Sequence, residues 1–99
     1  MLIVVDDEQE TTEEMAELLN SENFEVQSFN NGHRFKSSIV DFEGPLDAFI
    51  FDLKMPTLSG FDLIEFAKAR YPNVPIIMIT GHGTQVDAER ALNSGANLV

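Results

Sequence analysis

The chain has 99 residues, the size of one small domain, and 43% of them are hydrophobic, which is enough for a core. Seventeen acidic residues face six basic ones, and the formal net charge of -11 argues against a nucleic-acid-binding surface, because phosphate contacts need a basic patch. The chain has no cysteine, no apolar run of membrane-spanning length and no basic leader, so we expect a cytoplasmic domain without disulfides, thiolate metal sites or a membrane partner.

A buried strand and an amphipathic helix are predicted first. Residues 2–5 form an apolar, β-branched run that ends in three acids at positions 6–8, which is typical of a buried strand. A helix should follow, with Thr11 or Thr12 as its N-cap, and it should end within residues 20–23. Its expected inward face carries apolar residues at helical spacing: Met15, Leu18 and Leu19.

A half-buried strand and a second helix come next. Residues 24–29 alternate apolar and polar side chains, which predicts a strand at the edge of the sheet. A turn at residues 30–32 leads into a helix that Gly44 and Pro45 should end. The expected inward residues of this helix recur at i, i+4 and i+7: Phe35, Ile39 and Phe42.

The second half of the chain contains two further strand–helix units. Residues 48–51 are apolar and precede Asp52, so they predict a buried strand with a carboxylate at its carboxyl end. A loop rich in turn residues follows, and a helix is predicted over residues 61–70. Residues 75–80 predict a fourth buried strand, and a weaker helix is expected over residues 85–93.

Strands that alternate with helices predict an α/β fold, a doubly wound parallel sheet in a single domain over residues 1–99. Residues 97–99 resemble the start of a fifth strand, so we expect the flavodoxin-like order 2-1-3-4-5, truncated in the fifth strand and with the last helix absent. In this order the first and third strands are neighbours, and ligands bind at the carboxyl ends of the strands. Asp6, Asp7 and Asp52 should therefore converge in one cleft.

Three carboxylates in one cleft repel one another and destabilise the fold unless a cation neutralises them. An oxygen-only set of ligands suits Mg²⁺, which keeps several waters and favours phosphate as a co-ligand. An aspartate beside such an ion can act as a nucleophile and form an aspartyl phosphate, so Asp52 is the candidate acceptor. Thr80 ends the neighbouring strand, so its hydroxyl should reach the same phosphoryl group, and Gly81 leaves room for that group.

With this arrangement the chain resembles the receiver domains of bacterial two-component response regulators. The resemblance covers essentially all of the chain in the same order, and residues 79–83 are similar to receivers of the nitrogen-regulation and nitrogen-fixation types. The elements that carry it are the acidic pair Asp6-Asp7, Asp52, the run Lys54-Met55-Pro56, Gly60, Thr80 with a small neighbour, and Ser94-Gly95-Ala96.

The resemblance implies a phosphoacceptor signalling domain, with at most self-catalysed phosphorylation and dephosphorylation. Asp52 would take a phosphoryl group from a phosphohistidine on a sensor histidine kinase or a phosphotransfer protein. Asp7 would bind Mg²⁺ directly and Asp6 mainly through water, while Asp52 and the backbone carbonyl of Lys54 would complete the protein ligands. Thr80 would swing towards the phosphoryl group and pull the following loop and helix with it, which is a population shift between two states.

Two further side chains are candidates for tuning the lifetime of the phosphoryl group. His82 lies two residues after Thr80, and it either controls the access of hydrolytic water or is an exposed loop histidine. The Lys54 side chain either tunes dephosphorylation or offsets the negative charge around it. The loops that follow the third and fourth strands therefore each carry one candidate tuning residue, and both alternatives stay open for each of them.

The chain departs from the family pattern at its last residues. The Lys-Pro pair that ends the fifth strand in the family would come three residues after Val99, and Val99 itself stands where the family usually has Tyr or Phe. The sequence is therefore either a fragment of a longer regulator or a naturally shortened receiver. In both cases we expect an uncovered face on the fourth strand, and marginal stability or self-association there.

Two other functions stay open from the sequence. A haloacid-dehalogenase-type phosphatase also uses a strand-end aspartate with Mg²⁺, but it usually has a second aspartate two residues later, where this chain has Lys54. A pseudo-receiver would keep the fold as an interaction module that is not productively phosphorylated. The missing lysine favours that reading, the complete set of Asp6, Asp7, Asp52 and Thr80 opposes it, and Mg²⁺ binding would discriminate.

Overall fold

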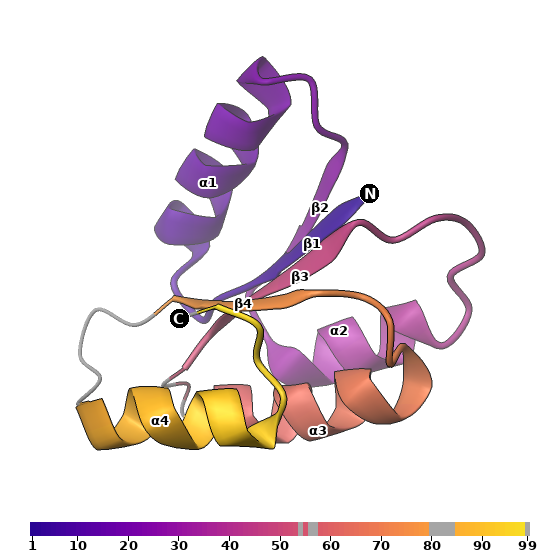
Figure 1. Ribbon diagram of the computed structural model, residues 1–99. Helices are drawn as coiled ribbons and strands as arrows, with labels where there is room; N and C mark the ends of the chain where they lie inside the picture. Colours follow the sequence, from indigo (N-terminus) through magenta and orange to yellow (C-terminus); the bar gives the residue numbers. More distant parts are fainter. Residues whose placement is uncertain (54, 56–57, 80–84, 99) are drawn as a thin grey trace.

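The chain folds into a parallel sheet with helices on both of its faces (Figure 1). The computed structural model describes residues 1–53, 55, 58–79 and 85–98. In chain order the elements are β1 (Leu2–Val5), α1 (Gln9–Ser21), β2 (Val26–Phe29), α2 (Gly32–Ile39), β3 (Ala48–Asp52), α3 (Gly60–Arg70), β4 (Ile76–Ile79) and α4 (Gln85–Ser94). Within the described ranges, none of these helices has the length and apolar character needed to span a membrane.

The strand order in the sheet is β2-β1-β3-β4, and each neighbouring pair is parallel. This confirms the predicted order for the first four strands and the place of β2 at the edge. Val5 is paired with Phe51, so β1 and β3 end at the same level of the sheet. Leu98 forms an isolated parallel bridge with Ile77 of β4, at the place where the start of a fifth strand is predicted.

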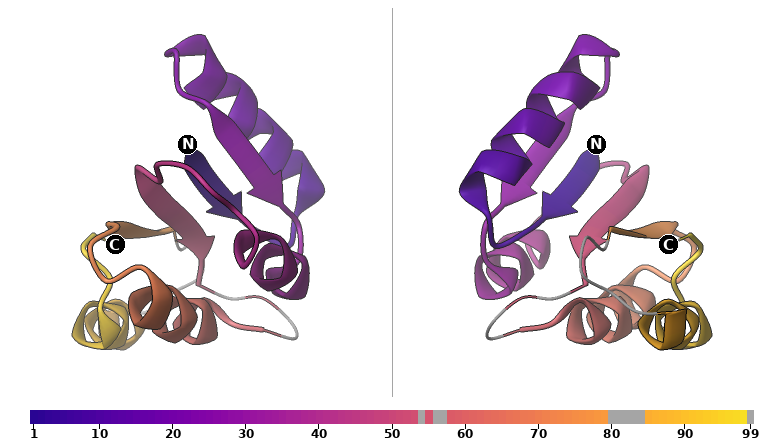
Figure 2. Two further views of the ribbon diagram at one scale, coloured as in Figure 1. Left: turned by 90° about the vertical axis from the view of Figure 1, so that its right-hand side faces the viewer. Right: turned by 90° about the vertical axis from the view of Figure 1, so that its left-hand side faces the viewer.

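The two faces of the sheet are covered unequally. α1 lies on one face, and α2, α3 and α4 lie on the other (Figures 1 and 2). Successive side chains of a strand point to opposite faces. The side chains that belong to the main core alternate accordingly along three strands: Ile3, Val5, Phe49, Phe51, Ile76 and Met78. The main core therefore lies between the sheet and the three helices.

Phe35 on α2 stands at the centre of this core. It is fully buried, and its ring meets four others at centroid distances of 5.4 to 5.9 Å, all edge to face: Phe29, Phe49, Phe51 and Phe66. Edge-to-face pairs bring the positive rim of one ring to the negative face of another, which is favourable beyond the burial of area. The inward positions predicted for Phe35 and Ile39 are confirmed, and Phe42 is half-buried against the same core.

Two predictions for the first helix are wrong. α1 begins at Gln9 with Glu8 as its N-cap and without a side-chain cap, not at either predicted threonine. The reason lies in Asp6, whose Oδ1 accepts a hydrogen bond from the Glu8 amide at 3.0 Å and turns the chain into the helix early. The Thr12 hydroxyl instead donates to the Gln9 carbonyl at 2.8 Å. Leu18, which was predicted to face inward, is 64% exposed. The side of α1 that packs against the sheet is the one that carries Thr12, which is buried.

The second strand and the second helix are both shorter than predicted. β2 begins at Val26, and Phe24 is exposed because the chain is still turning there, with a positive φ of 71° at Asn23. α2 ends at Ile39, well before the predicted stop. The Tyr71 hydroxyl donates to the Ile39 carbonyl at 3.1 Å and so satisfies a group at the end of the helix.

The third and fourth helices agree closely with prediction. α3 starts one residue before the predicted range and ends at Arg70, as predicted. α4 extends one residue beyond the predicted range. Gly95 follows it with a positive φ of 123°, the conformation for which glycine is favoured after a helix.

Candidate functional site

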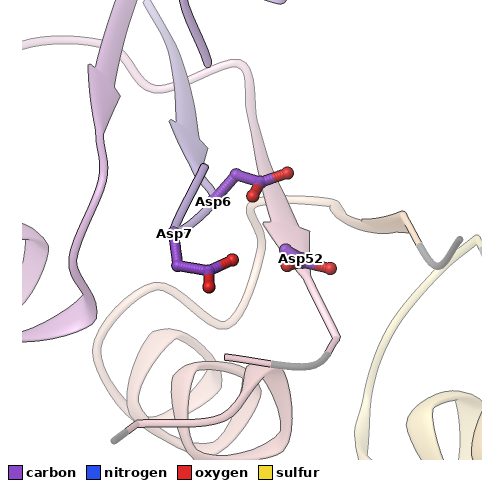
Figure 3. Close-up of side chains that lie close together, drawn as sticks. All are labelled: Asp6, Asp7 and Asp52. Atoms are coloured by element: carbon purple, nitrogen blue, oxygen red, sulfur yellow. The ribbon is translucent and has the colours of Figure 1, made fainter. Parts of the chain in front are cut away.

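Three aspartates meet at the carboxyl ends of two neighbouring strands (Figure 3). Asp6 and Asp7 directly follow β1, and Asp52 is the last residue of β3. One carboxylate oxygen from each of the three lies within 4.8 Å of the others. Because β1 and β3 are parallel and in register as far as Val5 and Phe51, they deliver these side chains to the same edge of the sheet. The predicted convergence is confirmed.

The three carboxylates differ in exposure. Asp6 is only 9% exposed, Asp52 is half-buried and Asp7 is exposed. Burial raises the pKa of Asp6 above its ordinary value, the hydrogen bond from the Glu8 amide lowers it in part, and the neighbouring charges of Asp7 and Glu8 raise it again. Ionising this carboxyl is therefore unfavourable unless a cation lies beside it.

The backbone around Asp52 is held by the start of α3. The Gly60 amide donates to the Leu53 carbonyl at 3.0 Å, and the Leu53 amide donates to the Ile79 carbonyl at 3.1 Å. A Cβ atom on Gly60 would lie 2.5 Å from the Asp52 carbonyl oxygen and 2.5 Å from Met78 Cε. A residue without a side chain is needed at this approach, so Gly60 positions the phosphoacceptor candidate.

The first turn of α3 contains a capping box that the sequence analysis missed. Ser59 Oγ accepts a hydrogen bond from the Asp62 amide at 3.4 Å, and the Asp62 carboxylate accepts one from the Ser59 amide at 3.1 Å. The spacing of a serine and an acidic residue three positions later is a signal for this motif, so the sequence contained it. The box defines where α3 begins and therefore supports the position of Gly60.

Three of the predicted site residues, Lys54, Thr80 and His82, lie outside the residues that the structure describes. Their roles stay predictions. Of the neighbouring motif, Met55 is described and is half-buried against the core. The described part of the site is thus the group of three aspartates and the backbone that holds them.

Comparisons with known proteins agree with this geometry. A putative NtrX-like response regulator of Rickettsia bellii (strain RML369-C) is 33% identical over 97 residues, which are 96% of this chain and 20% of that protein. The crystal structure of a response regulator receiver domain protein from Clostridium thermocellum is similar with a TM-score of 0.84 and 31% identity, over 98% of this chain and 77% of that one. The solution structure of a beryllofluoride-activated NtrC4 receiver domain dimer gives a TM-score of 0.85 and 28% identity, over 98% and 79%.

The family model agrees with these relatives. The model described as the response regulator receiver domain matches residues 2–99, which is nearly all of this chain. The chain spans only a fifth of the length of the NtrX-like relative, so the activity of such a whole regulator is not transferred to it. The match removes the phosphatase alternative, since the members of this family are signalling domains and not classical enzymes. The fold, the three aspartates and this match together show that the chain belongs to the response regulator receiver domain family of two-component systems.

Proposed function

We propose that Asp52 accepts a phosphoryl group from the phosphohistidine of a sensor histidine kinase or a phosphotransfer protein. The observation that carries this proposal is the meeting of carboxylate oxygens from Asp6, Asp7 and Asp52 within 4.8 Å at the strand ends. Asp52 is half-buried, so its carboxylate is held by the sheet and still open to a reacting group. The family to which the chain belongs supports the same reaction.

The proposed reaction is a transfer between two side chains. An oxygen of the Asp52 carboxylate attacks the phosphorus atom, an O–P bond forms and the P–N bond to the histidine breaks. The electron pair of the broken bond stays on the imidazole nitrogen of the donor. Such transfers depend on positioning and on positive charge near the phosphoryl oxygens. Three carboxylates alone would repel the phosphoryl group, so the reaction needs a cation.

The donor set fits Mg²⁺, because it consists of oxygen ligands at a partly exposed site. We assign Asp7 as a direct ligand and Asp6, which already accepts a hydrogen bond from the Glu8 amide, as a ligand through water. Asp52 and the backbone carbonyl of Lys54 complete the proposed set. When bound, the ion would neutralise the carboxylates and hold the oxygens of the phosphoryl group.

The remaining assignments concern the response to phosphorylation. Thr80 is proposed to donate its hydroxyl to a phosphoryl oxygen and to draw the following segment and α4 with it. His82 and the Lys54 side chain are proposed to tune the rate at which water removes the phosphoryl group. We place these events in the cytoplasm, where receiver domains typically act.

The test uses Mg²⁺ with beryllofluoride, which mimics a phosphoryl group on an aspartate, and records backbone amide shifts by NMR. We expect shifts around Asp7, Asp52 and α4 that are absent in Asp52→Asn, a variant of the same shape that lacks the nucleophile. If beryllofluoride changes nothing while Mg²⁺ alone still shifts the amides near the cluster, the chain is the pseudo-receiver instead.

A further inference from the structure

Arg90 on α4 stacks on the ring of Phe61 on α3. The guanidinium carbon lies 3.9 Å from the ring centroid, well inside the roughly 6 Å over which a cation is attracted to an aromatic face. Arg90 is one of six basic residues in a chain with seventeen acidic ones. Within the described ranges its guanidinium nevertheless forms no ion pair. The aromatic ring is thus the partner of this cation.

Phe61 is closely connected to the backbone of Asp52. It follows Gly60, whose amide donates to the Leu53 carbonyl at 3.0 Å. Gly60 approaches the Asp52 carbonyl so closely that a Cβ would lie 2.5 Å from its oxygen. Close-packed groups of this kind transmit displacements, because no space is left between them. A shift of the Asp52–Leu53 backbone would therefore move the first turn of α3 and the Phe61 ring with it.

α4 is the element on which such a movement would act. Its Ala91 is fully buried, whereas Val86 is 72% exposed and Leu92 is 48% exposed. Just after its C-terminal end, Gly95 lies against the side chain of Lys68, so that a Cβ on Gly95 would be 2.9 Å from Lys68 Cγ. The contact with Phe61 is made at the opposite end of α3, the end nearer to the aspartates. A change in this contact would alter the apolar surface that α4 exposes.

We propose that Phe61 and Arg90 are a positioning pair that carries the state of Asp52 to α4 through the first turn of α3. This inference rests on the proposed function of Asp52. It adds a second route to the one assigned to Thr80, which reaches α4 along the chain. Neither member of the pair belongs to the proposed phosphoryl site, so both would act through the position of a helix.

A second cation–aromatic contact on α3 provides a matched control. The Lys36 ammonium of α2 lies 5.0 Å from the centroid of the Phe66 ring. This contact has the same chemistry and also joins α3 to a neighbouring helix, but that helix is α2. Lys36→Gln and Arg90→Gln each remove one positive charge and one cation–aromatic contact from the same helix. They differ in the helix that the contact joins to α3, which is α2 for Lys36 and α4 for Arg90.

The test measures amide shifts with Mg²⁺ alone and with Mg²⁺ plus beryllofluoride. We expect Arg90→Gln and Phe61→Leu to reduce the response of the α4 amides by about half or more, with the affinity for beryllofluoride changed by no more than about twofold. The double variant should respond like either single variant, because one contact is lost in all three. Arg90→Lys keeps the cation and should keep most of the response, and Lys36→Gln should respond like the wild type.

An unchanged α4 response in Arg90→Gln overturns the inference, and so does an equal loss in Lys36→Gln. The inference is also overturned if Arg90→Gln loses the amide response at Asp7 and Asp52 as well as the response of α4. The pair would then help to assemble the site instead of carrying its state to α4. If Phe61→Leu does not fold, Arg90→Gln tests the inference by itself, because Arg90 is exposed. A wild type that responds at the aspartates and not in α4 refutes this inference and the role assigned to Thr80, and it leaves the proposed role of Asp52 as phosphoacceptor standing. A wild type without any beryllofluoride response refutes the proposed function and this role with it.

Discussion

Asp6 is buried beside Asp7, and its pKa is raised mainly because burial removes water from the carboxyl. A carboxyl whose pKa is higher in the folded chain than in the unfolded chain stabilises the fold in its protonated form. That stabilisation is present below the unfolded pKa and is lost as the pH rises through the folded pKa. At neutral pH the ionised Asp6 therefore destabilises the metal-free protein, and a bound cation would offset this.

We expect Asp6→Asn to raise the melting temperature of the metal-free protein at pH 7 and to reduce the further increase that Mg²⁺ produces. Asparagine keeps an oxygen for the Glu8 amide and removes the charge, and a ligand of the folded state stabilises it by mass action. Melts in EDTA and in Mg²⁺ measure both effects, and the metal-free difference should shrink at acid pH. Asp41→Asn changes an exposed carboxylate and serves as the control. A metal-free Asp6→Asn that melts below the wild type would contradict this account.

Gly60 is the second residue on which the site depends. Gly60→Ala should lower the free energy of unfolding by about 1–3 kcal/mol, because its Cβ would overlap the Asp52 backbone and Met78. Urea unfolding measures this effect, and the affinity for beryllofluoride should fall in the same variant. In the control Gly32→Ala the nearest atom is Leu58 Cδ2 at 2.8 Å, the end of a side chain that can rotate away, so a smaller loss is expected. Equal losses would argue against the special role of Gly60.

At the scale of elements, the structure differs from the sequence pattern in the residues that cap the first turns of the helices. Asn31 is the N-cap of α2, and its Oδ1 accepts hydrogen bonds from the His33 amide at 2.8 Å and the Arg34 amide at 3.3 Å. Thr11, which the sequence favours as a cap, lies inside α1. The two residues are both polar and both near a helix start, so they form a direct comparison.

We expect Asn31→Ala to lower the free energy of unfolding by about 1 kcal/mol, because two amides at the start of α2 lose their acceptor. Thr11→Ala should change it by less than about 0.5 kcal/mol, because the Thr11 hydroxyl donates to the exposed Glu8 carboxylate and caps no backbone amide among the described residues. Urea titrations of both variants measure the difference. A larger loss for Thr11→Ala than for Asn31→Ala would contradict the absence of a side-chain cap at the start of α1.

At the scale of the whole molecule, the sheet face that carries α1 is the less protected one. In the described part of the chain, Ile79 on β4 is 36% exposed and Leu98, whose backbone bridges to β4, is 60% exposed. Exposed apolar area next to an open strand edge favours pairing with another chain. The predicted association of the 99-residue chain thus has a defined location.

We expect this chain to sediment as a species larger than the monomer, and Leu98→Lys to shift it towards the monomer, because a charge at the strand edge disfavours pairing. Leu18→Lys is the matched control, since Leu18 is also a leucine with 64% exposure but lies on α1. Sedimentation velocity measures the outcome. A monodisperse wild-type monomer with a cooperative melt well above room temperature would count against the prediction.

Much of the fold could be predicted because three of the strands, β1, β3 and β4, are short apolar runs, as residues 48–51 are before Asp52. Element boundaries were less predictable. α1 starts early because of a hydrogen bond from the Glu8 amide to Asp6, and the end of α2 at Ile39 is met by the hydroxyl of Tyr71, which is remote in sequence. The periodicity of hydrophobic residues predicts neither of these two hydrogen bonds.

The sequence by itself determined the class of fold, the neighbouring position of the first and third strands, and the membership of Asp6, Asp7 and Asp52 in one site. These follow from local patterns and from the way parallel strands connect. Only the tertiary structure decided how closely Gly60 approaches Asp52, and that Arg90 lies on the ring of Phe61. The physical reason is that a local pattern specifies which side chains are buried, whereas the partner of each side chain depends on how distant segments pack together.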